Sequence, residues 1–108
     1  MVQLLPDYLK SSLDLWEIVY RVHATQRMFE RRIEAEDIKR LLENGSIIAT
    51  YEEDYPFPSV LIGGKSVDNR HFHCVVGIDA DSRYLYIITI YEPDPEKWTD
   101  DYTKRRTS

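Results

Sequence analysis

The sequence of 108 residues contains a single cysteine, Cys74, and no long apolar segment. A lone thiol cannot form a disulfide within the chain, so no internal disulfide framework holds this fold. The longest apolar stretches are only a few residues, whereas a membrane-spanning helix needs about 20. The first ten residues also lack the basic start and apolar run of a secretion signal. We therefore expect a cytoplasmic protein that does not cross a membrane.

Positive charge is also scarce, because 14 Lys and Arg residues stand against 19 Asp and Glu residues, a formal net charge of −5. General binding to nucleic acid depends on clustered cations that neutralise phosphates. The composition argues against such binding, and any nucleic-acid site must be local. Repeats, low-complexity tracts and Ser/Gly-rich linkers are absent. We expect one domain over residues 1–108, with looser order in about ten residues at each end.

The apolar pattern of the first half predicts two helices. The first is expected over residues 11–32, where apolar residues recur at helical spacing. Its predicted core-facing residues are Leu15, Ile18, Val22 and Phe29. The second helix is expected to begin at Glu34 or Ala35 and to end near Glu43, where Asn44-Gly45 provides a stop.

The second half is rich in β-branched and aromatic residues, which predict four strands. The expected strands cover residues 46–53, 58–63, 70–78 and 83–91. Turn-forming residues between the later strands favour antiparallel neighbours. The sequence therefore predicts an α+β fold in which two N-terminal helices pack on a four-stranded, mostly antiparallel sheet, followed by an irregular C-terminal tail.

The first predicted helix carries a second, polar side opposite its apolar stripe. Its members are Trp16, Tyr20, His23, Arg27 and Arg31. Arginine forks suit phosphate, and aromatic rings suit nucleic-acid bases. The alternative is an ordinary solvated face, on which Arg and Glu pairs contribute little. If the apolar stripe faces the sheet, His23 lies far from His73 on the strands, unless the site is at the edge of the sheet.

The strand over residues 70–78 places His71 and His73 on one face and Cys74 on the other, because side chains alternate. The same alternation in the next strand groups Leu85, Ile87, Thr89 and Tyr91 on one face, and it predicts Thr89 and Tyr91 as neighbours of His73. Thr and Tyr are also common in strands that have no catalytic role. Two histidines without Cys74 are too few ligands for zinc, which takes at least three from the protein. We therefore expect no metal and no other cofactor, and we expect Cys74 in the core.

Four short motifs, in this order, resemble a known protein family. They are His23-Ala24-x-x-Arg27-Met28-x-x-Arg31-x-Ile33, Gly45-Ser46-Ile47-Ile48, Arg70-His71-x-His73-x-Val75 and Ile88-Thr89-Ile90-Tyr91-x-Pro93. Together they make the chain similar to the DUF4258 family of domains of unknown function, from about Val22 to Arg106. Arg32 departs from the family pattern, in which this position is commonly Gly, and is less permissive in a turn.

The resemblance implies a small bacterial protein with a fold like that of the RelE-like toxin ribonucleases, often encoded beside a zinc-finger protein that resembles an antitoxin. The expected function is a metal-independent endoribonuclease toxin. Such a site needs a base, an acid and cations that stabilise charge on phosphorus. The candidate catalytic residues are His73, His23, Tyr91 and Thr89, and the candidate phosphate or RNA contacts are Arg27, Arg31, Arg105 and Arg106.

The alternative function is a noncatalytic protein-binding or regulatory domain. In this interpretation His23, Arg27, Arg31 and the tail engage an acidic protein surface, and the strand histidines are structural. The net charge of −5 favours this alternative, since ribonuclease toxins are more often basic.

Overall fold

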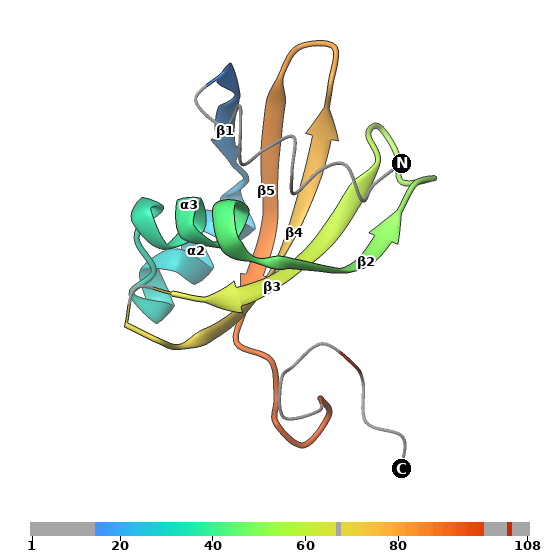
Figure 1. The fold of residues 1–108 in the computed structure, drawn as a ribbon. Coiled ribbons are helices and arrows are strands. Elements are labelled where there is room, and N and C mark those ends of the chain that lie inside the picture. The colour runs from blue at the N-terminus through green and yellow to red at the C-terminus, as the bar shows by residue number, and fades with distance from the viewer. Residues whose placement is uncertain (1–14, 67, 99–103, 105–108) are drawn as a thin grey trace.

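The computed structural model describes residues 15–66, 68–98 and 104 (Figure 1). In chain order the elements are β1 (Glu17–Tyr20), α2 (Val22–Arg31), α3 (Ala35–Asn44), β2 (Ser46–Tyr51), β3 (Ser59–Lys65), β4 (His71–Asp79) and β5 (Tyr84–Tyr91). The strands form one sheet in the order β1-β5-β4-β3-β2. β1 runs parallel to β5, and the other neighbours are antiparallel. The α+β class is confirmed, but the described sheet has five strands and is mixed.

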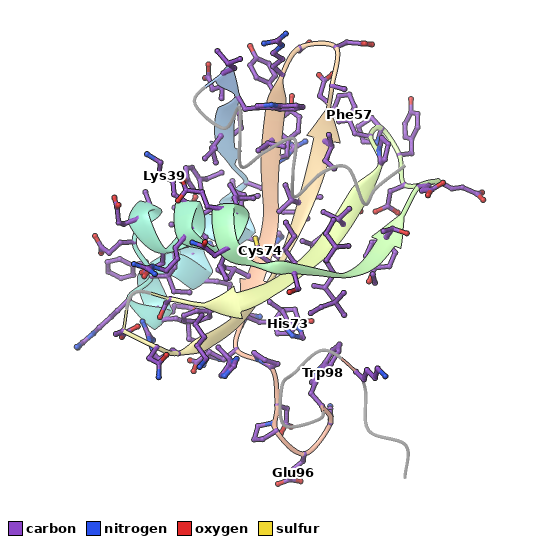
Figure 2. The ribbon with its side chains drawn as sticks, viewed as in Figure 1. Lys39, Phe57, His73, Cys74, Glu96 and Trp98 are labelled. Carbon is purple, nitrogen blue, oxygen red and sulfur yellow. The ribbon has the colours of Figure 1, made fainter. Side chains whose placement is uncertain are left out.

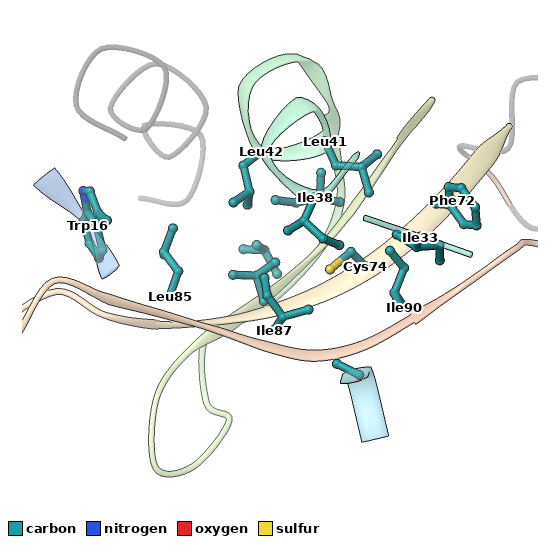
Figure 3. Close-up of a cluster of buried hydrophobic side chains, with 14 residues drawn as sticks. Trp16, Ile33, Ile38, Leu41, Leu42, Phe72, Cys74, Leu85, Ile87 and Ile90 are labelled. Carbon is teal, nitrogen blue, oxygen red and sulfur yellow. The ribbon is translucent and has the colours of Figure 1, made fainter. Parts of the chain in front are cut away.

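The main core lies between α3 and one face of the sheet. α3 buries Ile38, Leu41 and Leu42, and Figure 3 shows these side chains pointing toward the strand residues Cys74 and Ile87. The rest of this cluster includes Ile33, Val60, Ile62, Phe72, Val76, Leu85 and Ile90. Burying one aliphatic side chain of this size contributes about 1.5 to 3 kcal/mol. Cys74 is a core residue, as the sequence predicts.

The end of α3 is where the sequence predicts it. The helix ends at Asn44, and the amide of Gly45 donates a hydrogen bond of 2.8 Å to the carbonyl of Leu41. Gly45 has a φ of −74°, so its backbone does not require glycine. Glycine is required there for lack of space, because a Cβ would lie 2.5 Å from the carbonyl oxygen of Leu41 and 2.9 Å from the carbonyl oxygen of Gly63.

The predicted first helix is wrong over its N-terminal part. Residues Glu17–Tyr20 form β1, and the helix begins at Val22. The prediction for residues 11–14 lies outside the described residues. β1 pairs with β5 from Glu17↔Tyr84 to Tyr20↔Ile87, and the amide of Arg21 continues this pairing with a 3.0 Å hydrogen bond to the Ile87 carbonyl. This long-range pairing satisfies the backbone of β1 without a helix.

The predicted apolar stripe consequently does not form the core. Leu15, Val22 and Phe29 are 62%, 71% and 87% exposed, whereas Ile18 is partly buried against the core. The buried residue of α2 is Ala24, and Met28 packs beside the core one turn later. Trp16 and Tyr20, predicted on the polar side, also pack with the core. The side of α2 that faces the protein therefore differs from the predicted one.

The turn between α2 and α3 has the conformation that a glycine would favour. Arg32 adopts φ 57° and ψ 49°, which is left-handed and costs a non-glycine residue about 1 kcal/mol. The guanidinium of Arg70 donates hydrogen bonds of 2.8 Å and 3.1 Å to the carbonyls of Arg31 and Arg32. These bonds hold the loop before β4 against the end of α2.

The sequence predicts looser order in about ten residues at each end. These segments, residues 1–10 and 99–108, lie outside the described part of the chain, except for Lys104. After β5, residues 92–98 lack helix and extended strand, in agreement with the predicted irregular tail. Over the described residues, no helix has the length and apolar character needed to span a membrane.

Candidate functional site

The candidate site lies on the face of the sheet opposite α3. Phe72, Cys74 and Val76 of β4 belong to the main core, and His73 alternates with them and points the other way. In the register of β4 and β5, His73 is opposite Tyr91, and Val75 is opposite Thr89. The structure therefore confirms that Tyr91 lies beside His73 on the neighbouring strand. Thr89 lies on the same face, two residue pairs away.

A bulge in β5 makes this arrangement possible. The register shifts between Val75 and Val76, so Val76 pairs with Ile87 and Cys74 with Ile90, and both isoleucines are buried in the core. Strict alternation predicts that Ile87 and Thr89 share a face, and this is wrong. Because Ile88 is an additional residue in β5, the side chains after it point to the opposite faces from those that strict alternation would give them.

His73 is buried, with 1% of its surface exposed. Its Nδ1 atom is hydrogen-bonded to the hydroxyl of Tyr91 at 3.2 Å. The rings of Tyr91 and Trp98 both meet the imidazole edge-on, with centroids 5.4 Å and 4.4 Å away. On another side lies Gly63, where a Cβ would be 3.1 Å from Cδ2 and 3.3 Å from Nε2 of His73. The imidazole thus occupies a closely packed pocket of aromatic rings and backbone.

Trp98 reaches this pocket from the segment that follows β5. The carbonyl of Asp94 accepts hydrogen bonds from the amides of Lys97 and Trp98, at 2.9 Å and 3.1 Å, and its carboxylate accepts one from Glu96. These bonds form a turn that directs the chain back to the sheet, and Figure 2 shows Trp98 beside His73. Trp98 is 7% exposed and lies outside the main core cluster. It therefore forms part of a second, smaller packed region around His73.

His71 is the neighbouring residue on the same face. It is opposite Lys65 in the register of β3 and β4, and it is only partly buried. Burial lowers the pKa of His71, and the charge of Lys65 lowers it further. The sequence places His71 beside His73 by alternation, but it gives His71 no role. Its neutral imidazole is the more accessible of the two in this structure.

The cationic residues of α2 are exposed and only partly near this pocket. Arg31 forms a salt bridge of 3.2 Å with Glu92, the residue after Tyr91. His23 and Arg27 are exposed earlier in the helix. His23 lies about 12 Å from Arg31 along the helix axis, given 1.5 Å per residue. The structure thus brings Arg31, rather than His23, to the end of β5 that carries Tyr91. Arg105 and Arg106 lie outside the described residues.

Over residues 15–66, 68–98 and 104, no group of three or more His, Cys, Asp or Glu residues is arranged to hold a metal ion. Cys74 points into the core, away from both strand histidines, and its burial raises the thiol pKa to about 12. The side chains that contact His73 are the Tyr91 hydroxyl and ring and the Trp98 ring.

The sequence profile described as "Domain of unknown function (DUF4258)" matches residues 20–92. The chain belongs to the DUF4258 family. No curated protein and no solved structure matches the sequence.

The DUF4258 match covers the helices and strands that build the site, including His23, His71, His73 and Tyr91. It ends at Glu92, earlier than the similarity that the motifs suggest, which extends to about Arg106. Trp98 therefore lies beyond the matched segment, although it packs directly on His73. The matched segment also contains Arg32, whose backbone is left-handed.

Proposed function

We propose that the chain is a metal-independent endoribonuclease of the toxin type, with its site at His73 and Tyr91. The observation that carries the proposal is their 3.2 Å hydrogen bond, formed between neighbouring strands on the face opposite α3. Histidine is the side chain that most often serves as general acid or base, and the Tyr91 hydroxyl gives His73 a hydrogen-bonding partner on the neighbouring strand.

RNA cleavage of this kind needs three contributions. A base removes the proton of the ribose 2′-hydroxyl, an acid protonates the leaving 5′ oxygen, and cations stabilise charge on phosphorus. His73 would act as base or acid. Tyr91 would orient the imidazole ring of His73. Thr89, which lies two residue pairs further along the strands, would position the scissile group. Arg31, beside Tyr91 through its bridge to Glu92, would contact phosphate.

His23 and Arg27 would bind RNA but would take no part in the cleavage step. Both are exposed on α2, before Arg31. They would bind the RNA strand away from the scissile phosphate, together with Arg105 and Arg106. His23 is a candidate catalytic residue in the sequence. The α2 residue whose side chain contacts the end of β5 is Arg31, through Glu92, so we do not assign proton transfer to His23.

Burial of His73 sets a condition on this activity. With 1% of the residue exposed and the Trp98 ring centroid 4.4 Å from its own, substrate can reach the imidazole only after Trp98 moves. The proposed enzyme is therefore closed in this structure. A zinc-finger protein of the antitoxin type, implied by the family resemblance, would be the partner that controls it.

The test is to incubate the purified protein with RNA in the presence of a chelator and to analyse the ends of any fragments. We expect products with cyclic phosphate termini. His73→Ala should reduce the rate about 100-fold or more, and Tyr91→Phe, which keeps the ring and loses the hydroxyl, should reduce it about tenfold. Lys39→Ala, on the exposed side of α3, is the control cation and should cleave normally.

The second candidate function is a noncatalytic binding domain, and the burial of His73 beneath Trp98 favours it. A buried histidine that is satisfied by a hydroxyl can be purely structural. Intact RNA after incubation with folded protein would reject the enzyme and support this candidate. So would cleavage that His73→Ala and Tyr91→Phe leave unchanged, because the activity would then come from another source.

A further inference from the structure

The sheet has a group of aromatic side chains at the end of its strands remote from His73, here called the aromatic end. The rings of Phe57 and Tyr86 stack, with centroids 5.4 Å apart and planes inclined by 7°. Tyr84 meets Tyr86 edge-on at 6.0 Å. Figure 2 shows Phe57 at the opposite end of the sheet from His73 and Trp98. This cluster therefore forms a surface separate from the candidate catalytic site.

Small residues lie opposite Tyr86 on the neighbouring strands. In the sheet register Tyr86 is opposite Gly77, and Gly77 is opposite Ser59, so small residues lie beside the Tyr86 ring. Ser59 is held below the surface by a 2.5 Å hydrogen bond to Asp54. Phe57, in the same loop as Asp54, occupies the space next to Tyr86. Tyr84 remains 36% exposed, and Tyr55 is 95% exposed.

Negative charge surrounds these rings. Tyr84 is registered with Glu17 of β1 on one side and with Asp79 of β4 on the other. Further exposed carboxylates follow in the two adjacent loops. They are Glu52, Glu53 and Asp81. Among residues 15–21 and 79–91, which hold β1, the turn before β5 and β5 itself, the cations are Arg21, directly after β1, and Arg83, directly before β5.

One ring at the aromatic end already binds a cation. The guanidinium carbon of Arg21 lies 4.9 Å from the centre of the Tyr86 ring. An aromatic face attracts a guanidinium by about 0.5 to 1 kcal/mol at exposed sites. Tyr84 presents a similar ring, flanked in register by two carboxylates rather than by a cation.

We propose that the aromatic end is a docking surface for a basic segment of a partner protein, with arginine or lysine side chains placed over Tyr84 and between Glu17 and Asp79. The partner's cations would gain both the aromatic contact and the carboxylates. Its aliphatic stems would cover the exposed edges of the rings. A nucleic acid fits less well, because its phosphates would face these carboxylates. This proposal is independent of the proposed cleavage chemistry.

The experiment is a titration of isotope-labelled protein followed by two-dimensional NMR at physiological ionic strength. The probes are a short polyarginine peptide, a polyglutamate peptide of the same length, and oligouridine. We expect polyarginine to shift the signals of Tyr84, Tyr86 and their strand neighbours first. Tyr84→Ser should weaken its binding about fivefold, and Glu17→Gln about threefold.

The matched control is Phe29→Ser, which removes an aromatic residue that is 87% exposed on α2. It should leave polyarginine binding unchanged. The proposal is wrong if Tyr84→Ser binds polyarginine as tightly as the wild type, or if the shifts are spread evenly over all acidic surfaces. It is also wrong if polyglutamate or oligouridine binds at the aromatic end with greater affinity than polyarginine.

Discussion

His71 and His73 lie two residues apart on β4 and face the same way, yet the sheet gives them different surroundings. His73 is enclosed by Gly63, Tyr91 and Trp98, whereas His71 is partly exposed beside Lys65. Burial and the Lys65 charge both lower the pKa of His71. At neutral pH His71 is therefore a neutral imidazole, which suits a proton acceptor better than a phosphate-binding cation.

The first prediction concerns this pKa. We expect the ring protons of His71 to titrate below the usual value of about 6.5 in an NMR titration. Lys65→Gln should raise the His71 pKa by removing the nearby positive charge, whereas Lys39→Gln on α3 should not change it. A His71 pKa at or above the usual value in the wild type, or no response to Lys65→Gln, would contradict the assignment.

The same shift has a consequence for stability. Because the folded-state pKa of His71 is lowered, the unfolded chain takes up the proton first as the pH falls. The contribution of His71 to the free energy of unfolding is therefore unchanged above about pH 7 and decreases as the pH falls through about 6.5. Urea unfolding of His71→Gln should show a weaker decrease than the wild type over this range.

Cys74 provides the third residue-scale prediction. It is 1% exposed in the core, and burial raises its thiol pKa to about 12. Since the thiolate is the reactive form, Cys74 should not react with Ellman's reagent at pH near 8 in the native protein. It should react fully in guanidinium chloride. Rapid stoichiometric reaction of the native protein would show that the core around β4 opens readily.

At the scale of elements, the junction of α3 and β2 depends on the absence of a side chain at Gly45. A Cβ there would lie within 3 Å of two backbone carbonyl oxygens, neither of which can move without shifting α3 or β3. Gly45→Ala should therefore lower the free energy of unfolding by about 2 to 3 kcal/mol. Chemical denaturation followed by circular dichroism measures this change.

Gly77→Ala is the matched control for that measurement. A Cβ at Gly77 would make ordinary contacts, 3.4 Å from Ile88 and 3.6 Å from Tyr86. Its effect should stay within about 1 kcal/mol, and a small stabilisation is compatible with the lost flexibility of the unfolded chain. Equal losses for the two variants would mean that the close approach at Gly45 does not determine stability.

At this scale, local sequence signals predict most of the helices and strands, but not all of them. α3 and strands β2 to β5 were predictable because periodicity, strand-forming residues and turn residues agree locally. β1 was not, because Glu17–Tyr20 continues a helical spacing, and only its distant partner β5 makes it a strand. The bulge at Ile88 leaves no local signal either. The sequence places Thr89 and Tyr91 beside His73 without revealing the register shift that accommodates buried Ile87 and Ile90.

At the scale of the whole molecule, two groups of aromatic side chains lie at opposite ends of the strands. His73, Tyr91 and Trp98 lie at one end of the strands, and Phe57, Tyr84 and Tyr86 at the other. The pair His73 and Tyr91 was predictable from alternation in adjacent strands. The contact with Trp98 was not, because it depends on how the turn at Asp94 folds the chain back.

The last prediction tests whether Trp98 controls access to His73. In the wild type, diethyl pyrocarbonate should modify exposed His23 and partly exposed His71 faster than His73, which is 1% exposed. Trp98→Ala removes the ring whose centroid lies 4.4 Å from that of His73. Modification of His73, located by mass spectrometry, should then become about tenfold faster, because smaller local openings suffice to expose it. The lost packing should cost about 3 kcal/mol.

Trp98→Phe separates access from general loss of structure. The smaller ring still covers the imidazole, so His73 should remain protected while stability falls less than in Trp98→Ala. His71 supplies the internal reference, since its modification rate should be the same in all three proteins if the sheet stays folded. If His73 in Trp98→Ala reacts as slowly as in the wild type, then Trp98 is not the cover, and a substrate would have to approach His73 from the side of Gly63, where Nε2 lies.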